Sequence, residues 1–318
     1  MKIGQLTLEG YAALAPMAGV ADRAFRELCM RFGASYCVSE MVSSKGISYS
    51  SKKSAELMEI GESERPCAVQ LFGTEPEVMA QAARFALSYR PEVIDIDMGC
   101  PAPKIAGSGS GAALMRRPAL CGEIVKAVAN AVDIPVTVKI RAGFDEDHIN
   151  AVEIARIAEE NGAAAVTVHG RTRNQFYAPP VNYDIIRDVK KALSIPVIAN
   201  GDITDAKSAK FVYEYTGCDH IMVGRGTLGN PWIFNEINTY FQKGIILPPP
   251  DIDEKCDILL EHIERLVELK GERVGMREAR KHTAYYIKGF KNAAKLRNKA
   301  FSMETLEDLT GLIQLIKG

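Results

Sequence analysis

The sequence predicts a (β/α)8 barrel followed by a small helical domain, and three observations support this fold class. Eight short β-rich runs recur over about 230 residues, with helical segments between many of them. No G-x-G-x-x-G motif opens the first unit, which weakens the alternative of an open, doubly wound sheet. A proline-rich stretch after the eighth unit then separates it from three further segments with helical spacing.

The strand and helix patterns follow one another in the order that a barrel requires. The strand-like runs cover residues 11–17, 35–41, 66–72, 93–98, 135–141, 165–169, 196–200 and 220–224. Apolar residues at three- and four-residue spacing predict helices over 22–32, 75–88, 118–132, 148–161, 183–193 and 205–215. Eight such units match a barrel better than a doubly wound sheet.

The rest of the chain is predicted to form a separate domain. We expect a barrel over residues 1–243, a stiff linker over 244–252 that contains Pro248-Pro249-Pro250, and a helical domain over 253–318. Helical patterns in the last part cover 257–270, 276–290 and 303–316. Gly271 and Gly275 are expected to break the first of these helices from the second.

Composition is that of an ordinary soluble globular protein, with 47% hydrophobic and 25% charged residues. No apolar run approaches membrane-spanning length, and the N-terminal residues lack the apolar core of a signal peptide. The seven scattered cysteines never form a C-x-x-C pair, which argues against a disulfide framework and a zinc site. We therefore expect a protein of the reducing cytoplasm. We separately expect a monomer without a metal.

Charge is unevenly distributed along the chain. Residues 270–299 contain ten Lys and Arg against two acids, so this window carries +8 while the remainder carries −9. A solvated helix face is the alternative interpretation, but ten cations against two acids are lopsided for that. The pattern favours a polyanionic partner that contacts mainly the C-terminal domain.

Distinctive residues follow the ends of the predicted strands, the face at which barrel enzymes hold their active sites. They are Pro16, Met17 and Ala18 after the first strand, Gln70 at the third, Cys100 after the fourth, Lys139 and Arg141 at the fifth, His169 at the sixth, Asn200, Gly201 and Asp202 at the seventh, and Gly224 and Arg225 at the eighth. The glycine-bearing turns after the last two strands lie where barrels commonly bind a phosphate.

Cys100 lies between Gly99 and Pro101 at the end of a buried strand, so its thiol can face a cleft. Three glycines in the following residues 107–111 let this loop approach a ligand closely. The alternative is a small core residue, which is the usual role of a free cysteine. A thiol with an unperturbed pKa of about 8.5 is mostly protonated at neutral pH and can act as an acid.

Lys139 and Arg141 are two apart on a strand and therefore face the same side, where they need an anion, an electron-rich ring or barrel carboxylates. His169 alone is more often a hydrogen-bonded core residue, but with Lys139, Asn200 and Arg225 it becomes a plausible ligand contact. Gln70 can hydrogen-bond a heterocyclic edge through its amide, or equally well be a satisfied core polar group. FMN fits this inventory, with its phosphate at the last two turns and its ring near Lys139.

Six ordered motifs resemble the tRNA-dihydrouridine synthases, in particular the bacterial B subfamily. They are LAPMAGV from Leu14, QLFG from Gln70, MGCPAPK from Met98, VKIR from Val138, VHGRT from Val168 and VGRG from Val223. The resemblance covers the barrel throughout, and the helical tail matches that family's tRNA-binding domain in kind.

The resemblance implies a flavoenzyme that reduces the C5–C6 double bond of particular uridines in tRNA. NADPH or NADH reduces FMN, hydride passes to C6, and Cys100 protonates C5. It further implies FMN contacts from Pro16, Met17, Ala18, Gln70, Lys139, Asn200, Gly201, Asp202, Gly224 and Arg225, with His169 beside the cofactor. For tRNA we expect contacts from Arg277, Arg280, Lys281 and Lys288, the first three on one helix face.

One residue departs from the family pattern. Asp97 occupies a position where the family usually has Asn, and an ionised Asp cannot donate the hydrogen bond of an amide. Its charge is expected to raise the pKa of the Cys100 thiol, which suits an acid.

Two alternatives remain. An FMN-dependent dehydrogenase of a free pyrimidine would share the flavin site but would not need the basic tail. A non-enzymatic tRNA-binding or regulatory protein would explain the tail but leave Cys100, Lys139 and His169 without a purpose at one face.

Overall fold

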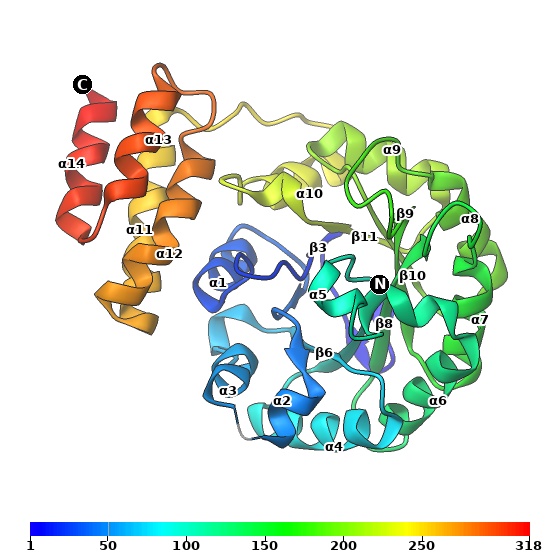
Figure 1. Ribbon diagram of the computed structural model, residues 1–318. Coiled ribbons are helices and arrows are strands. Elements are labelled where there is room, and N and C mark those ends of the chain that lie inside the picture. The colour runs from blue at the N-terminus through cyan, green and yellow to red at the C-terminus, as the bar shows by residue number, and fades with distance from the viewer. Residues whose placement is uncertain (50) are drawn as a thin grey trace.

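The computed structural model describes residues 1–49 and 51–318 and contains a closed parallel barrel (Figure 1). Its eight strands are β3 (Ala12–Leu14), β4 (Cys37–Val38), β6 (Cys67–Phe72), β7 (Val93–Met98), β8 (Val136–Gly143), β9 (Ala165–Thr172), β10 (Val197–Asn200) and β11 (His220–Val223). A pairing of β4 with β6 closes the ring, and the short β5 (Val42–Ser43) pairs in parallel with the last residues of β6. The predicted fold class is confirmed. Each predicted strand run overlaps one of the eight barrel strands, although β8 and β9 continue beyond their predicted ends to Gly143 and Thr172.

Helices surround the barrel on its outside, except for the single turn at Pro103–Ala106, which follows β7 and lies over the strands (Figure 1). They are α1 (Arg23–Arg31), α2 (Ser44–Ser48), α3 (Lys52–Met58), α4 (Pro76–Ala86), α5 (Pro103–Ala106), α6 (Pro118–Ala129), α7 (Ala151–Glu160), α8 (Tyr183–Ala192), α9 (Ala206–Thr216) and α10 (Ile233–Lys243). Short 3-10 turns lie at Glu62–Glu64, Leu87–Tyr89, Gly111–Arg116 and Arg225–Thr227. The six predicted helices correspond to α1, α4, α6, α7, α8 and α9, whereas α2, α3, α5 and α10 were not predicted.

Strand β7 shows how the sequence builds the barrel interior. Ile94, Ile96 and Met98 belong to the apolar layer between strands and helices. The alternate residues face the barrel interior: Val93 lies at the start of the strand, and the buried acids Asp95 and Asp97 follow toward its end. An N-terminal hairpin, β1 (Lys2–Ile3) with β2 (Leu6–Thr7), packs Ile3 on the apolar end. The interior is therefore apolar at one end and polar at the C-terminal mouth.

The tail forms a domain of four helices with its own apolar core: α11 (Ile252–Lys270), α12 (Glu272–Tyr286), α13 (Ala293–Ser302) and α14 (Leu306–Lys317). Helix α13 was not predicted, because only Leu296 and Ala300 of that helix are buried and its apolar periodicity is weak. The helix predicted over 276–290 is α12, which begins earlier, at Glu272, and ends earlier, at Tyr286.

Gly275 does not break a helix, contrary to the prediction. It lies inside α12, where an added Cβ would be 2.9 Å from the Cα of Val267 in α11. The glycine therefore allows two helix backbones to approach closely. Gly271, with φ near +75°, is the residue between α11 and α12 and makes the turn.

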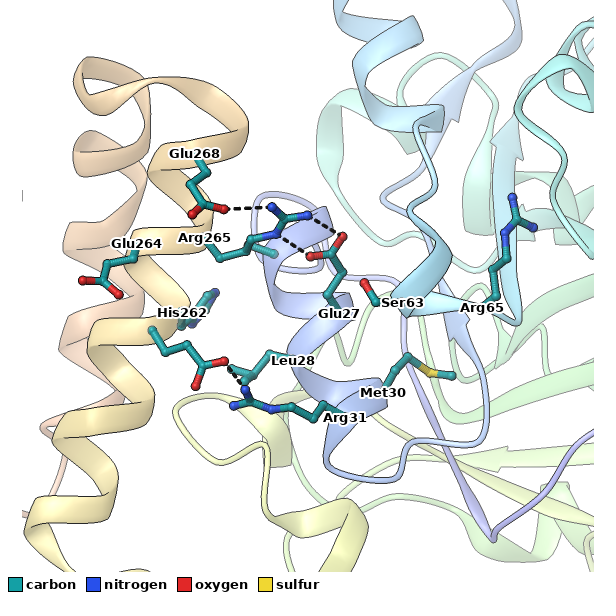
Figure 2. A pocket seen from close by; sticks show the side chains of 12 residues that line it. Glu27, Leu28, Met30, Arg31, Ser63, Arg65, His262, Glu264, Arg265 and Glu268 are labelled. Carbon is teal, nitrogen blue, oxygen red and sulfur yellow. Dashed lines mark hydrogen bonds and ion pairs between the residues drawn. The ribbon is translucent and has the colours of Figure 1, made fainter.

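Polar side chains join the tail to the barrel between α1 and α11. Figure 2 shows Arg265 of α11 between Glu27 of α1 and Glu268, around a cleft of about 650 Å³; Arg265 Nε lies 2.6 Å from Glu27 Oε2. Deeper in the same contact, Asp22 Oδ2 lies 3.3 Å from Nε2 of the buried His282 of α12. These contacts hold the tail beside the barrel mouth. In the described part of the chain, no helix is both long and apolar enough to cross a membrane.

Candidate active site

A cavity of about 1350 Å³ opens at the C-terminal ends of the barrel strands. It is lined by Cys100 and by all eleven residues expected to contact the cofactor: Pro16, Met17, Ala18, Gln70, Lys139, His169, Asn200, Gly201, Asp202, Gly224 and Arg225. Other lining residues were not predicted from the sequence; they include Phe176 and Tyr177 in the loop after β9 and Tyr285, Arg297, Asn298 and Phe301 in the tail. No motif marks these positions, because only the docking of the tail brings the last four to the mouth.

Cys100 is set apart from the other six cysteines by its exposure. All seven thiols are free, and Cys100 is the one that is not buried. An added Cβ at Gly111 would be 2.8 Å from the Cys100 carbonyl oxygen and 3.1 Å from its Cβ, and Gly111 has φ near +59°. At least this glycine therefore serves the packing of the loop against Cys100, in addition to any approach to a ligand that the sequence suggested.

Asp97 holds the backbone at Cys100. Its Oδ1 accepts hydrogen bonds from the amides of Gly99 at 3.2 Å and Cys100 at 3.0 Å. Burial, with the Asp97 charge next in size, raises the pKa of the Cys100 thiol to about 11. The direction agrees with the expected effect of Asp97, and the thiol is protonated at neutral pH.

The two cations of β8 have different roles. Lys139 and Arg141 both line the cavity, as their spacing predicted. Arg141 is buried and donates to the carbonyls of Gly99, Thr172 and Phe176, so it braces the loops after β7 and β9. The side chain of Lys139 makes no hydrogen bond or ion pair with any described residue. Burial and then Arg141 lower the pKa of Lys139 to about 8. Its ammonium group is therefore available to a ligand.

Three neutral side chains present polar atoms to the cavity. Gln70 Nε2 donates to Asp95, and Asn200 Nδ2 donates to the Met222 carbonyl at 2.8 Å, which leaves both amide oxygens without a donor among the described residues. Burial, and then Lys139 and the nearby arginines, hold the pKa of His169 well below its usual range, so the ring is neutral. This set suits a polar heterocycle rather than a metal ion.

The turns after β10 and β11 form a cradle for an anion. Across residues 1–49 and 51–318, the amide groups of Gly201, Asp202 and Gly224 donate to no protein atom. The Asp202 carboxylate is neutralised by a bidentate pair with Arg171, at 2.9 and 2.6 Å, and by Arg225 at 2.8 Å. Free amides beside a guanidinium at the mouth of a barrel suit a phosphate.

The four residues expected to contact tRNA lie in different surroundings. Arg277 is exposed on α12, whereas Arg280 donates to the Met303 carbonyl at 2.8 Å and so supports the tail. Lys281 faces the loop after β3, with its Nζ 3.4 Å from where a Gly19 Cβ would be. Lys288 is exposed and lines the cavity, beyond the end of α12.

A model of the family described as "Dihydrouridine synthase (Dus)" matches residues 13–316. The chain belongs to the dihydrouridine synthase family. It is 47% identical over 287 residues to tRNA-dihydrouridine synthase B of Shewanella oneidensis, covering 90% of this chain and 89% of that protein. It is 44% identical to the protein of the same name from Vibrio cholerae, with 96% and 95% covered.

A solved structure supports the fold of this family member. Histamine dehydrogenase from Rhizobium sp. 4-9 superposes with a TM-score of 0.57 over 83% of this chain and 50% of that protein. The sequences are 13% identical, so the likeness concerns the barrel fold alone.

Proposed function

We propose that this dihydrouridine synthase reduces the C5–C6 double bond of uridines in tRNA, with FMN at the barrel mouth and NADPH or NADH as the reductant. The observation that carries the proposal is one cavity in which the Cys100 thiol, the unpartnered Lys139 ammonium and an anion cradle line the same space. The family membership and the named relatives support the same substrate.

The residues present fit FMN. The free amides at Gly201 and Gly224, with Arg225, suit its phosphate, while Lys139 and the amide oxygen of Gln70 face the space for its ring. Pro16, Met17, Ala18, Asn200, Asp202 and His169 supply the remaining walls. FMN, once reduced, supplies the two electrons and the hydrogen that uracil takes up at C6.

Cys100 supplies the proton for C5. Its thiol is held in the protonated form, and its backbone is fixed through Asp97 and through Arg141 at the Gly99 carbonyl. General acid catalysis by a positioned group contributes about 10²–10⁴-fold. The thiolate left after transfer is reprotonated from solvent, because Cys100 is partly exposed.

The tail offers a cationic surface for the tRNA backbone. Lys288, Lys291, Lys295, Arg297 and Lys299 are exposed and form no ion pair with described residues. Lys288 and Arg297 line the cavity itself, so the surface is continuous with the catalytic mouth. A uridine must leave its stack to enter such a mouth, and a free pyrimidine would need no such surface. Arg277, Lys281, a cytoplasmic location and a monomeric state stay predictions.

Flavin identification tests the cofactor assignment. The purified protein is expected to show flavin absorbance, and the flavin released by heat should run as FMN in chromatography. Stopped-flow reduction with NADPH and NADH then ranks the two reductants. A colourless protein that gains no flavin absorbance with added FMN would contradict the proposal.

A further inference from the structure

Three polar side chains meet inside the barrel, one level below the mouth. Gln70 on β6, Asp95 on β7 and Thr137 on β8 are register partners on neighbouring parallel strands, so they lie side by side. Thr137 Oγ1 donates to Asp95 Oδ1 at 2.5 Å, and Gln70 Nε2 donates to Asp95 Oδ2 at 2.8 Å. All three side chains are buried, so each carboxylate oxygen has one fixed donor.

The carboxylate of Asp95 determines which end of the Gln70 amide faces the cavity. An ionised carboxylate only accepts hydrogen bonds, so the amide nitrogen of Gln70 must turn toward it. Oε1 is then left for the cavity that Gln70 lines, and no described residue donates to that oxygen. A buried glutamine without Asp95 would be free to turn its amide by half a rotation.

We propose that Asp95 is a positioning residue for the cofactor, which fixes Gln70 so that Oε1 accepts a hydrogen bond from a flavin ring N–H. The inference rests on the proposed function, because it takes the ligand to be a flavin. An oxidised isoalloxazine ring has one N–H, at N3, between two carbonyl groups. A Gln70 amide turned the other way would present donors to that donor, and an unmade buried hydrogen bond is costly.

The titration of Asp95 makes the arrangement testable. Burial raises the pKa of Asp95 to about 6, although hydrogen bonds from Thr137 and Gln70 oppose the shift. The titratable groups that face Asp95 are Asp97 on β7, Lys139 on β8 and Tyr36 before β4. Below that pH a protonated Asp95 can donate to Gln70 Oε1, and the constraint on the amide is removed.

FMN titration of the apo-protein, followed by flavin fluorescence, measures the effect without catalysis. Asp95→Asn is expected to weaken FMN binding about 10- to 100-fold at neutral pH, since the new amide permits the wrong Gln70 orientation. Asp219→Asn is the matched control. Asp219 pairs with Lys190 and does not line the cavity, so its isosteric change should leave FMN affinity unaltered.

A double-mutant cycle separates positioning from a general structural effect. In a Gln70→Ala background, Asp95→Asn is expected to change FMN affinity by less than about twofold, because its effect passes through Gln70. A second measurement needs no change at Asp95. As the pH drops through 6, the FMN affinity of the wild type should fall more than that of Gln70→Ala. Ionisation of the FMN phosphate also changes in this pH range, but it affects both proteins equally.

Two results overturn the inference while leaving the flavin assignment intact. One is equal FMN affinity in wild-type and Asp95→Asn protein. The other is a loss of affinity in Asp95→Asn that persists unchanged in the Gln70→Ala background. Failure of the wild-type apo-protein to bind FMN at all is a different result, because it overturns the proposed function and this inference together.

Discussion

Asp97 shows how a single residue governs both the geometry and the chemistry of the proposed acid. It accepts the amide hydrogens of Gly99 and Cys100, which fixes the backbone that carries the thiol. Burial raises the pKa of Asp97, but the Lys139 ammonium and the two amides oppose that rise. The ionised carboxylate then adds to the burial of Cys100 in keeping the thiol protonated.

Asp97→Asn is expected to lower the pKa of the Cys100 thiol. The amide oxygen still accepts the two backbone N–H groups, but the negative charge that disfavours the thiolate is gone. Because the thiolate is the species that reacts, alkylation of Cys100 by iodoacetamide should become about tenfold faster at a fixed pH below the thiol pKa. Mass spectrometry of the Cys100 peptide measures the rate, with Asp188→Asn on α8 as control. An unchanged pH profile would refute the electrostatic role of Asp97.

At this scale the sequence predicted the residues that lie in ordered motifs at strand ends, and the cavity contains all of them. It missed Asp95, since a carboxylate inside a strand shows no sign of the neighbours it binds across strands. The two-residue spacing placed Arg141 on the same face of the strand as Lys139, with the same need for an anionic partner. Only the loop after β9 shows that its guanidinium is occupied by backbone carbonyls.

Helix α13 and the loop before it add exposed cations to the surface that the sequence placed mainly on α12. The charge pattern alone could not show which of the two helices has cations available to a ligand, because that depends on which cations are already paired within the protein. Lys270 is bound to Glu278, and Arg280 to a backbone carbonyl, whereas the cations of 288–299 are exposed. The missing helix had too few buried residues to give a periodic pattern.

Neutralising Lys291, Lys295 and Lys299 together to Gln is expected to weaken tRNA binding and to make its salt dependence shallower. The logarithm of the tRNA association constant falls linearly with the logarithm of the salt concentration. For every phosphate that the variant no longer neutralises, the magnitude of this slope should decrease by about 0.7–0.9. Filter binding across a salt series measures the slope, and Lys52→Gln with Lys53→Gln on α3 is the matched control. A slope equal to that of the wild type would show that α13 does not contact the tRNA backbone.

The whole molecule depends on the contact that holds the tail beside the barrel. Asp22 caps α1 by accepting from the Phe25 amide and faces His282 of α12 across the two domains. Burial is the largest single influence and would raise the pKa of Asp22, but the interactions with its neighbours, His282 first among them, together outweigh burial and the net shift is downward. Burial also lowers the pKa of His262, the neighbour of His282, to about 3, so that ring is neutral.

Asp22→Asn is expected to destabilise the protein by about 3 kcal/mol near neutral pH, because it breaks a buried pair while retaining a capping side chain. A carboxyl with a lowered pKa stabilises the fold above its unfolded pKa of about 4, and loses that effect as pH falls toward its folded value. The difference between wild type and variant should therefore shrink in acid. Urea unfolding at several pH values measures it. A constant difference would contradict the ionic account.

The barrel and its mouth were predictable because strand periodicity and motif order are local signals. The contribution of the tail to the cavity at the mouth depends on long-range contacts and was not predictable. Phe301 and Arg297 join the cavity only through the docking of α11 on α1. Nothing in the spacing of the tail predicts that contact, since it depends on pairs such as Glu27 with Arg265, which are 238 residues apart.

The most direct test is the dihydrouridine content of tRNA after incubation with the purified protein, FMN and NADPH. Unmodified tRNA should gain dihydrouridine, detected by mass spectrometry of its nucleosides. Cys100→Ala should retain flavin and its reduction by NADPH yet lose about 10²–10⁴-fold in this reaction. Free uridine or uracil serves as the competing substrate. Wild-type protein that consumes NADPH with a free pyrimidine but leaves tRNA uridines unreduced would contradict the account.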